Sequence, residues 1–302
     1  MPGEVFYWIL NMSITASLTG LILLLLRKIR KIPRQLIFVL WVIPFLRMWV
    51  PVSIGSKYGL MDILSRAGIR TVMVYEGQTS ITTMNSIGAA DSYFPVIYKA
   101  EILSRIFGAA FVFWLIGCVA FLGILAFLYV GAIKELGNTM EWRDNIWLSE
   151  RIASPAVYGI FRPRIVMPAE YKDKEATYIL AHEKTHIRRL DNLWRLLGFV
   201  TACVHWFNPF SWLFLKLFLE DMELSCDERV LRGFDEKERK AYAAALVDCA
   251  EGGNALASAF GGAKIHKRIY RILSYKKISV FSGVCFAVLA AAVVWALLTN
   301  GV

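Results

Sequence analysis

Two long uncharged apolar runs, residues 5–26 and 106–133, limit what this chain can fold into more than any other feature. A helix needs about 20 apolar residues to cross a bilayer, and both runs reach that length. The whole chain is 57% hydrophobic and only 19% charged, which is not the composition of a soluble domain. We therefore predict an integral membrane protein in contact with membrane lipid.

Two further apolar runs predict two more membrane spans. Residues 36–52 form the expected second span, in which Pro44 introduces a kink. Arg47 lies near the outer end of this span, and we expect its side chain to snorkel to the outer surface. Residues 278–298 form the expected fourth span, so the prediction is a protein with four transmembrane helices.

Charge in the loops predicts the orientation. Residues 27–34 read RKIRKIPR, with five basic residues and no acidic one. The positive-inside rule places this loop in the cytoplasm and hence both termini outside. Residues 1–133 then form a membrane domain with an external loop at 53–105. Residues 134–277 form a cytoplasmic domain, and 278–302 hold the fourth span and an external C-terminus.

The net charge of +10 is explained by such cytoplasmic loops, and there is no basic arm or nucleic-acid motif. We therefore expect no direct nucleic-acid partner. None of the five cysteines lies in the predicted external loop, so no disulfide framework is indicated. No Cys-x-x-Cys pair occurs, which argues against a thiolate zinc site. The N-terminus has no basic region before its first apolar run, so that run reads as a retained span.

The predicted cytoplasmic domain is of the α+β class. Residues 145–168 alternate apolar and polar side chains between Pro and Gly, which predicts two or three short strands. An apolar stripe predicts one long helix from 175 to about 202. Residues 193–219 are apolar but interrupted by HWFNPF, which indicates a helical hairpin buried in the domain or dipping into the inner leaflet, with a re-entrant loop as the alternative. Further helices are expected at 211–231, 235–251 and 264–277.

The predicted long helix carries His182-Glu183-Lys184-Thr185-His186, an H-E-x-x-H motif. Residues four apart share one helix face, so His182 and His186 can offer two imidazoles to one metal ion. Zinc fits these donors and leaves a position for water. Zinc lowers the pKa of bound water from about 15.7 to about 7, and Glu183 is placed to take the proton. The alternative interpretation is that these residues form a charged, exposed helix turn that matches the H-E-x-x-H pattern by chance.

A zinc peptidase site needs a third protein ligand, which is expected from the following helix. Glu220, Glu223 and Glu228 all lie in LEDMELSCDERVL, and spacing alone does not separate them. Asp227 lies one turn after Glu223 and could orient a histidine ligand from behind. Asp191, after the motif, is a second candidate for that supporting role.

The remaining histidines are read as structural. We expect His205 to be a core or interface residue and His266 to lie on the surface of a basic helix. Residues 154–158 predict a short edge strand, because Pro155 near its start lacks a donor for a central ladder. Such an edge can bind an extended peptide, and we expect it to line the cleft beside His182.

The stretch from 179 to 231 resembles the BlaR/MecR-type antirepressor membrane metallopeptidases, through AHEKTHIRRLDNLWRLL, HWFNPFSWL and DMELSCDERVL. The resemblance extends to SPAVYGIFRPRIVMP before the motif, to AYAAALVDCA after it, and to the order of the spans. It implies that His182, His186 and Glu223 bind zinc, that Glu183 is the catalytic base and that Asp227 supports the site. It also implies a gluzincin-like cytoplasmic peptidase domain lodged against the membrane.

The function implied by this resemblance is cleavage of a cytoplasmic protein in transmembrane signalling. A transcriptional repressor of the penicillinase-repressor type and the chain itself are the candidate substrates. The chain ends after the fourth predicted span, so we expect a peptidase without the external penicillin-binding sensor domain of family receptors, either as a truncated receptor or as a sensorless member of the family. The competing readings are an inactive signalling or scaffold protein with structural zinc, and a transporter or channel. Intact Glu183 argues against the first, and few buried charges argue against the second.

Overall fold

The structure is a computed structural model that describes residues 2–29, 32–50, 54–55, 101–172, 176–251, 265–275, 288, 290–292, 294–295 and 299–300. Within these residues the fold is mostly helical, with one small mixed sheet of four strands. The predicted α+β class is therefore confirmed. The predicted external loop at 53–105 lies almost entirely outside the described residues, as does most of the predicted fourth span at 278–298.

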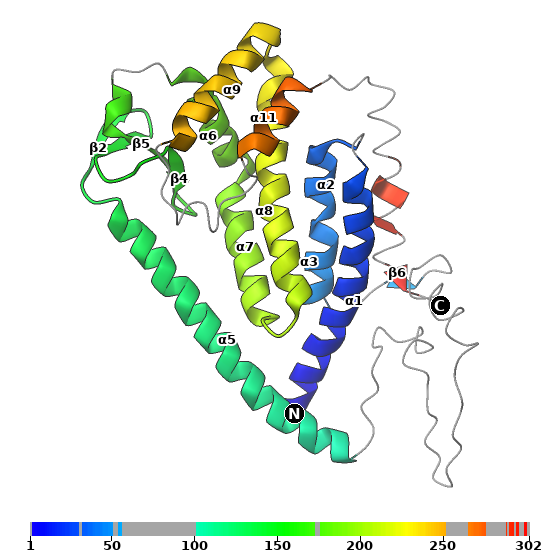
Figure 1. Cartoon of the computed structure of the whole chain (residues 1–302). Coiled ribbons are helices and arrows are strands. Elements are labelled where there is room, and N and C mark those ends of the chain that lie inside the picture. The colour runs from blue at the N-terminus through cyan, green and yellow to red at the C-terminus, as the bar shows by residue number, and fades with distance from the viewer. Residues whose placement is uncertain are drawn as a thin grey trace.

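Five helices form a bundle with similar axis directions (Figure 1). They are α1 (Pro2–Lys28), α2 (Arg34–Leu40), α3 (Val42–Trp49), α7 (Asp191–Val204) and α8 (Pro209–Val230). Large apolar side chains such as Trp41, Phe214 and Met222 are completely buried between them. Ala290 and Val294, which belong to the predicted fourth span, also pack against this core.

Among the described residues, two helices, α1 and α5 (Glu101–Glu135), are long and apolar enough to cross a membrane. They differ in what surrounds them. Half of the apolar window of α1 is buried in the bundle, whereas only 11% of the α5 window is buried. Phe113 and Phe127 of α5 are 68% and 77% exposed. Large apolar side chains exposed along a whole helix are suited to lipid rather than to water.

Most of the segment predicted as the second span forms two short helices, α2 and α3, separated at Trp41, and neither is long enough by itself to cross a membrane. The expectation that Arg47 snorkels to the outer surface is wrong. Its side chain is buried, with 3% of the residue exposed. The physical reason is that α3 packs against both α1 and α7, so the Arg47 side of the helix is enclosed by the bundle.

The sheet has the strand order β2-β3-β5-β4. Its strands are β2 (Thr139–Arg143), β3 (Ile146–Ser149), β4 (Ala156–Tyr158) and β5 (Arg164–Pro168). β3 and β5 are parallel, while β2 and β4 pair antiparallel with their neighbours. The sequence predicted two or three strands within 145–168, and the structure has three there, β3, β4 and β5, whereas β2 was not predicted. The expected edge strand is confirmed as β4, which pairs only with β5 in this sheet.

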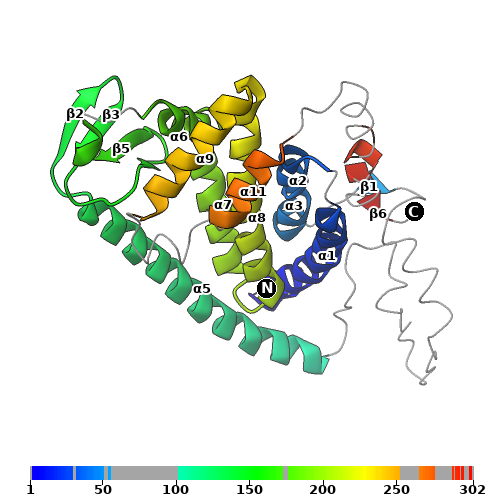
Figure 2. The same cartoon turned by 45° about the horizontal axis from the view of Figure 1, so that its top comes forward.

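The sheet packs against the motif helix α6 (Thr177–Arg189). Ile165 and Met167 of β5 share a buried cluster with Ile179 of α6. In both views α6 and α9 (Glu236–Glu251) lie between the sheet and the bundle, and α11 (Ile265–Leu273) crosses next to α8 (Figures 1 and 2). A two-stranded parallel sheet joins β1 (Ile54–Gly55) to β6 (Thr299–Asn300).

Candidate metal site

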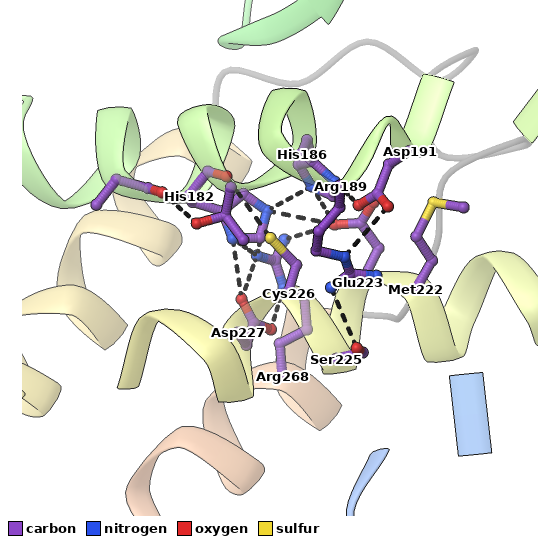
Figure 3. Close-up of polar contacts among 12 residues, drawn as sticks. His182, His186, Arg189, Asp191, Met222, Glu223, Ser225, Cys226, Asp227 and Arg268 are labelled. Carbon is purple, nitrogen blue, oxygen red and sulfur yellow. Dashed lines mark hydrogen bonds and ion pairs between the residues drawn. The ribbon is translucent and has the colours of Figure 1, made fainter. Parts of the chain in front are cut away.

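The motif histidines converge on one point. His182 and His186 are one turn apart on α6, and their Nε2 atoms are 3.0 Å apart. Both residues are buried, at 4% and 5% exposed. Figure 3 shows the two rings pointing from α6 toward α8, which carries Glu223, Cys226 and Asp227. The pair is therefore directed into the interior and not presented on an exposed helix face.

The predicted long helix is broken directly after the motif. Leu190 adopts the left-handed conformation, with φ 56°, so α6 ends at Arg189 and α7 begins at Asp191. The prediction of one continuous helix from 175 to about 202 is therefore wrong. The break turns Asp191 back toward the motif, where its Oδ2 lies 2.6 Å from His186 Nδ1. An ionised carboxylate can only accept here, so His186 donates from Nδ1 and keeps the lone pair of Nε2 for a metal.

Helix α8 places one of the three candidate acids beside the histidines. Glu223 Oε2 lies 3.5 Å from His182 Nε2 and 3.6 Å from His186 Nε2. The other oxygen, Oε1, accepts a hydrogen bond from the guanidinium of Arg195 on α7. The two carboxylate oxygens thus have different surroundings, one directed at the imidazoles and one held by a cation.

The other two acids are engaged elsewhere. Glu220 forms ion pairs with Arg27 of α1 and Lys267 of α11. Glu228 accepts a hydrogen bond from the backbone N–H of Gln35 at 3.2 Å. Spacing left Glu220, Glu223 and Glu228 open, and these contacts place only Glu223 against the His182–His186 pair.

The α8 helix begins where local sequence dictates. Asn208 caps it by accepting from the backbone N–H of Phe210 at 2.9 Å, and Pro209 occupies the first helical position. Both residue types are favoured at these places because the first N–H groups of a helix lack partners. The predicted interruption by HWFNPF is therefore the turn of an α7–α8 hairpin. His205 in this turn is completely buried, and its Nε2 contacts the carbonyl of Met48 at 3.1 Å, as expected for a core histidine.

A second layer of polar groups lies behind His182. The hydroxyl of Tyr242, from α9, donates to Asp227 Oδ1 at 2.6 Å and lies 2.8 Å from His182 Nδ1. Asp227 Oδ1 is itself 3.2 Å from the same nitrogen. Because the hydroxyl proton is donated to Asp227, Tyr242 accepts from His182 Nδ1–H. This arrangement leaves His182 Nε2 with a lone pair, as Asp191 does for His186.

Arg268 of α11 completes this layer. Its Nε and Nη2 atoms lie 2.8 Å from Asp227 Oδ2 and 2.7 Å from Asp227 Oδ1. Neither Tyr242 nor Arg268 was among the predicted site residues, because both come from helices distant in sequence and carry no local motif. By contrast, His266 of the same helix is exposed, as predicted.

Cys226 is a further group that the sequence analysis missed. It is fully buried on α8, three residues after Glu223, and its Sγ belongs to a cluster with His182 and His186 in which all ligand atoms lie within 4.8 Å of one another. Its Sγ also contacts the carbonyl oxygen of His182 at 3.6 Å. Helical spacing could have identified Cys226 from the sequence, because residues three and four positions after Glu223, which are Cys226 and Asp227, lie on the same helix face as Glu223.

The charges of the site stabilise one another. Burial by itself raises the pKa of Asp227, but the Arg268 guanidinium outweighs burial and holds that pKa well below its usual range. Burial also opposes ionisation of Glu223, but His186, His182 and Arg195 together keep its pKa well below the ordinary value. Both carboxyl groups are therefore ionised at neutral pH, as metal ligation and its support require.

Glu183, the expected base, is buried at 9% exposed and directly follows His182. Its carboxylate lies close enough to strand β4 to act on Tyr158. The pKa of the Tyr158 hydroxyl is raised mainly by burial, and to a smaller extent by the negative charges of Glu135 and Glu183. The motif helix α6 also packs directly against strand β4.

The donor set fits zinc. Two atoms that are each about 2.1 Å from one tetrahedral zinc ion are about 3.4 Å apart. The three separations among His182 Nε2, His186 Nε2 and Glu223 Oε2 are 3.0, 3.5 and 3.6 Å. Two imidazoles and one carboxylate are also a donor combination typical of catalytic zinc, because they leave a coordination position open.

Comparison with known proteins gives one family. A family profile described as BlaR1 peptidase M56 matches residues 7–272, which include every residue of this site. The regulatory protein BlaR1 of Bacillus licheniformis is 25% identical over 280 residues, covering 82% of this chain and 46% of that protein. The methicillin resistance mecR1 proteins of Staphylococcus aureus and Staphylococcus epidermidis are 30% identical over 105 residues, covering 33% of this chain and 18% of theirs. The chain spans less than half the length of these curated relatives.

Proposed function

Because this chain belongs to the BlaR1 peptidase M56 family, we propose that it is a membrane zinc endopeptidase that cuts a cytoplasmic protein in transmembrane signalling. The observation that carries the proposal is the convergence of His182 Nε2, His186 Nε2 and Glu223 Oε2 within 3.0 to 3.6 Å, with Glu183 next to them in sequence. A purely structural zinc site would not need the Glu183 carboxylate.

Each residue has a role in this proposal. His182, His186 and Glu223 hold zinc, which when bound polarises the scissile carbonyl and makes a water more acidic. Glu183 takes a proton from the attacking water and delivers it to the leaving amide nitrogen. Asp191 orients His186 through Nδ1. Arg195 holds Glu223 Oε1, so that Oε2 faces the two imidazoles.

The contacts of α8 support a site close to the membrane surface. Arg27, in the basic segment at the end of α1, pairs with Glu220 and Asp221 of α8. Glu223 follows Asp221 by only two residues. If α1 crosses the bilayer with its basic end in the cytoplasm, the metal site lies just inside that surface. The first half of α8 then lies level with the apolar part of α1, so the α7–α8 hairpin enters the inner leaflet.

This topology can be tested by labelling. A cysteine introduced at Ser80, in the predicted external loop, should react with an impermeant thiol reagent on intact cells. One introduced at Lys237, on the exposed side of α9, should react only after lysis. The unmodified chain gives the background of the native cysteines. The reverse pattern would place residues 134–277 outside and would exclude a cytoplasmic substrate.

For the substrate, we propose a transcriptional repressor of the penicillinase-repressor type, with self-cleavage as a second reaction. The names of the relatives support a role in the response to β-lactams, since they describe a regulatory protein and a methicillin resistance protein.

The central experiment compares zinc content and cleavage in purified full-length variants. A quenched fluorescent peptide library serves as the probe, and self-cleavage is followed on gels. Wild type and Glu183→Gln should bind one zinc each, and only wild type should cleave. His182→Ala and His186→Ala should lose zinc, and Glu223→Ala should bind it much more weakly than the matched variants Glu220→Ala and Glu228→Ala. Equal cleavage by wild type and Glu183→Gln would contradict the proposal, and zinc binding without cleavage by either would favour the inactive scaffold.

A further inference from the structure

Helix α11 contributes a buried cation to the wall of the metal site. Arg268 forms two hydrogen bonds to the two oxygens of Asp227, at 2.8 and 2.7 Å, and only 14% of its side chain is exposed (Figure 3). Such a two-pronged arrangement fixes the plane of the carboxylate as well as its charge. The sequence predicted a basic surface helix here, so the inward direction of Arg268 is a finding of the structure.

The same guanidinium also reaches the groups expected to hold the metal. Nη2 is 3.3 Å from His182 Nε2 and 3.4 Å from His182 Nδ1. Nη1 is 3.7 Å from Glu223 Oε2, the oxygen that faces the imidazoles. A cation this close to a metal site is tolerated only if an anion compensates it, and Asp227 does so.

Two further ion pairs set the register of α11 on α8. Lys267 pairs with Glu220, and Arg271 lies 3.8 Å from Glu228. These contacts flank the Arg268–Asp227 pair in sequence on both helices. Arg268 therefore reaches Asp227 only while α11 is docked along the acidic residues of α8.

We propose that Arg268 is a positioning residue of the metal site, and that tight metal binding requires α11 to be docked on α8. Arg268 holds the Asp227 carboxylate where it accepts from Tyr242. Tyr242 and Asp227 in turn hold the His182 ring with Nε2 directed at the metal. The inference rests on the zinc site of the proposed function, but it concerns a residue on another helix that no ligand motif includes.

Zinc affinity of the full-length chain in detergent tests this role, measured by competition with a chromogenic chelator. Removing an outer partner of a metal ligand typically weakens metal binding by about 10- to 100-fold, and we expect Arg268→Ala to fall in that range. Arg268→Lys should recover part of the loss, because an ammonium cannot bond both carboxylate oxygens in one plane. The matched control is Lys240→Ala, which also removes a cation and its ion pair, with Glu236 at 2.9 Å on the same helix, α9. The Lys240 side chain is 67% exposed and its ion pair lies within α9 and not between α8 and α11, so the loss of zinc affinity should be below about threefold.

The visible spectrum of the cobalt-substituted protein adds a readout of ligand geometry. Arg268→Ala should change the cobalt absorption bands, and Lys240→Ala should leave them as in wild type. Unchanged zinc affinity in Arg268→Ala would overturn the proposal. Tighter binding in that variant would also overturn it, since it would mean that Arg268 competes with the ion.

A double-mutant cycle separates this role from a general loss of folding. If Arg268 acts through Asp227, Arg268→Ala should cost little further affinity in an Asp227→Asn background. If the fold-losses of zinc affinity in Arg268→Ala and Asp227→Asn multiply in the double variant, Arg268 acts by a route other than Asp227. The two proposals can fail independently. Absence of zinc or of cleavage in wild type would contradict the proposed function. Unchanged zinc affinity in Arg268→Ala, in a protein whose wild type binds zinc and cleaves, would contradict only this inference.

Discussion

His186 Nδ1 lies 2.6 Å from Asp191 Oδ2, across the point where α6 ends and α7 begins. In an unbroken helix, side chains five residues apart point about 140° away from each other and could not meet in this way. The contact therefore depends on Leu190, whose left-handed backbone ends α6 and lets α7 start in a different direction. A single residue thus links the helix that carries the motif to the carboxylate that orients its second histidine.

Substitutions at Leu190 should reveal this strain. Its side chain is 53% exposed, so truncation costs little burial. Non-glycine residues are disfavoured in the left-handed region by about 1 kcal/mol. Leu190→Gly should therefore be more stable than Leu190→Ala by about that amount, as measured by thermal unfolding in detergent, with zinc content unchanged in both. A Leu190→Ala protein as stable as the glycine variant would show that Leu190 is not held in this conformation.

Asp191 itself should affect metal binding and not the fold alone. Asp191→Asn keeps the shape of the side chain but replaces the ionised acceptor of His186 Nδ1 with an amide. Loss of such a partner weakens metal binding by about 10- to 100-fold. The matched control is Asp235→Asn, since Asp235 caps the exposed start of α9 and lies outside the site. Equal zinc affinity in Asp191→Asn and Asp235→Asn would remove Asp191 from the supporting set.

Local patterns predicted the site only where the groups are close in sequence. The four-residue spacing identified the two motif histidines, and hydrophobic runs located α1, α5 and α8. The same reasoning missed the break at Leu190, because the apolar stripe of α6 continues into α7 and conceals the change of direction.

Long-range pairing decided the rest of the site. Spacing could not choose Glu223 over Glu220, because the choice depends on cations of α1 and α11 that occupy Glu220. Tyr242 and Arg268 approach His182 from helices that begin more than 50 residues later in the sequence. No local signal connects such residues, so only the packed fold brings them together. Arg47 shows the same limit, since its burial depends on neighbours that the sequence of its own helix does not specify.

The ion pairs of Glu220 predict a pH dependence of stability. Burial raises the pKa of Glu220, but Lys267 and Arg27 outweigh burial and lower it below its usual value of 4.5. A carboxyl group with a depressed pKa in the folded state stabilises the protein above its unfolded pKa and loses this contribution as the pH falls through the folded value. The unfolding midpoint should therefore decline below about pH 4.5.

The variant Glu220→Gln isolates this contribution. It should be less stable than wild type at pH 7 by roughly 1 kcal/mol or less, since Lys267 is partly exposed and solvent screens the pair. The difference between the two proteins should shrink on acidification and vanish well below pH 4. A difference that is constant between pH 7 and pH 3 would show that the ion pairs are not its source.

We predict that an extended substrate docks along the outer edge of strand β4. Val157 O accepts a hydrogen bond from Asn192 Nδ2 at 3.0 Å, so this carbonyl points away from β5. The N–H and C=O of one strand residue point to the same edge, so Val157 N–H also faces the outer edge of the sheet. Asn192 directly follows Asp191, and Tyr158 lies within the influence of the Glu183 charge. The edge is therefore next to the motif helix, and a peptide strand added there would lie beside the proposed zinc ligands.

Replacing Val157 with proline removes the outward N–H, whereas Val157→Ala keeps it and serves as the matched control. One lost backbone hydrogen bond costs about 0.5–1.5 kcal/mol, so cleavage of the peptide library by Val157→Pro should slow by about 2- to 12-fold. The alanine variant should stay near the wild-type rate. Zinc content and the unfolding midpoint must match wild type in both variants, because only then does the rate report on docking. If Val157→Pro keeps zinc and fold and cleaves as fast as Val157→Ala, substrate does not bind as an added strand at this edge.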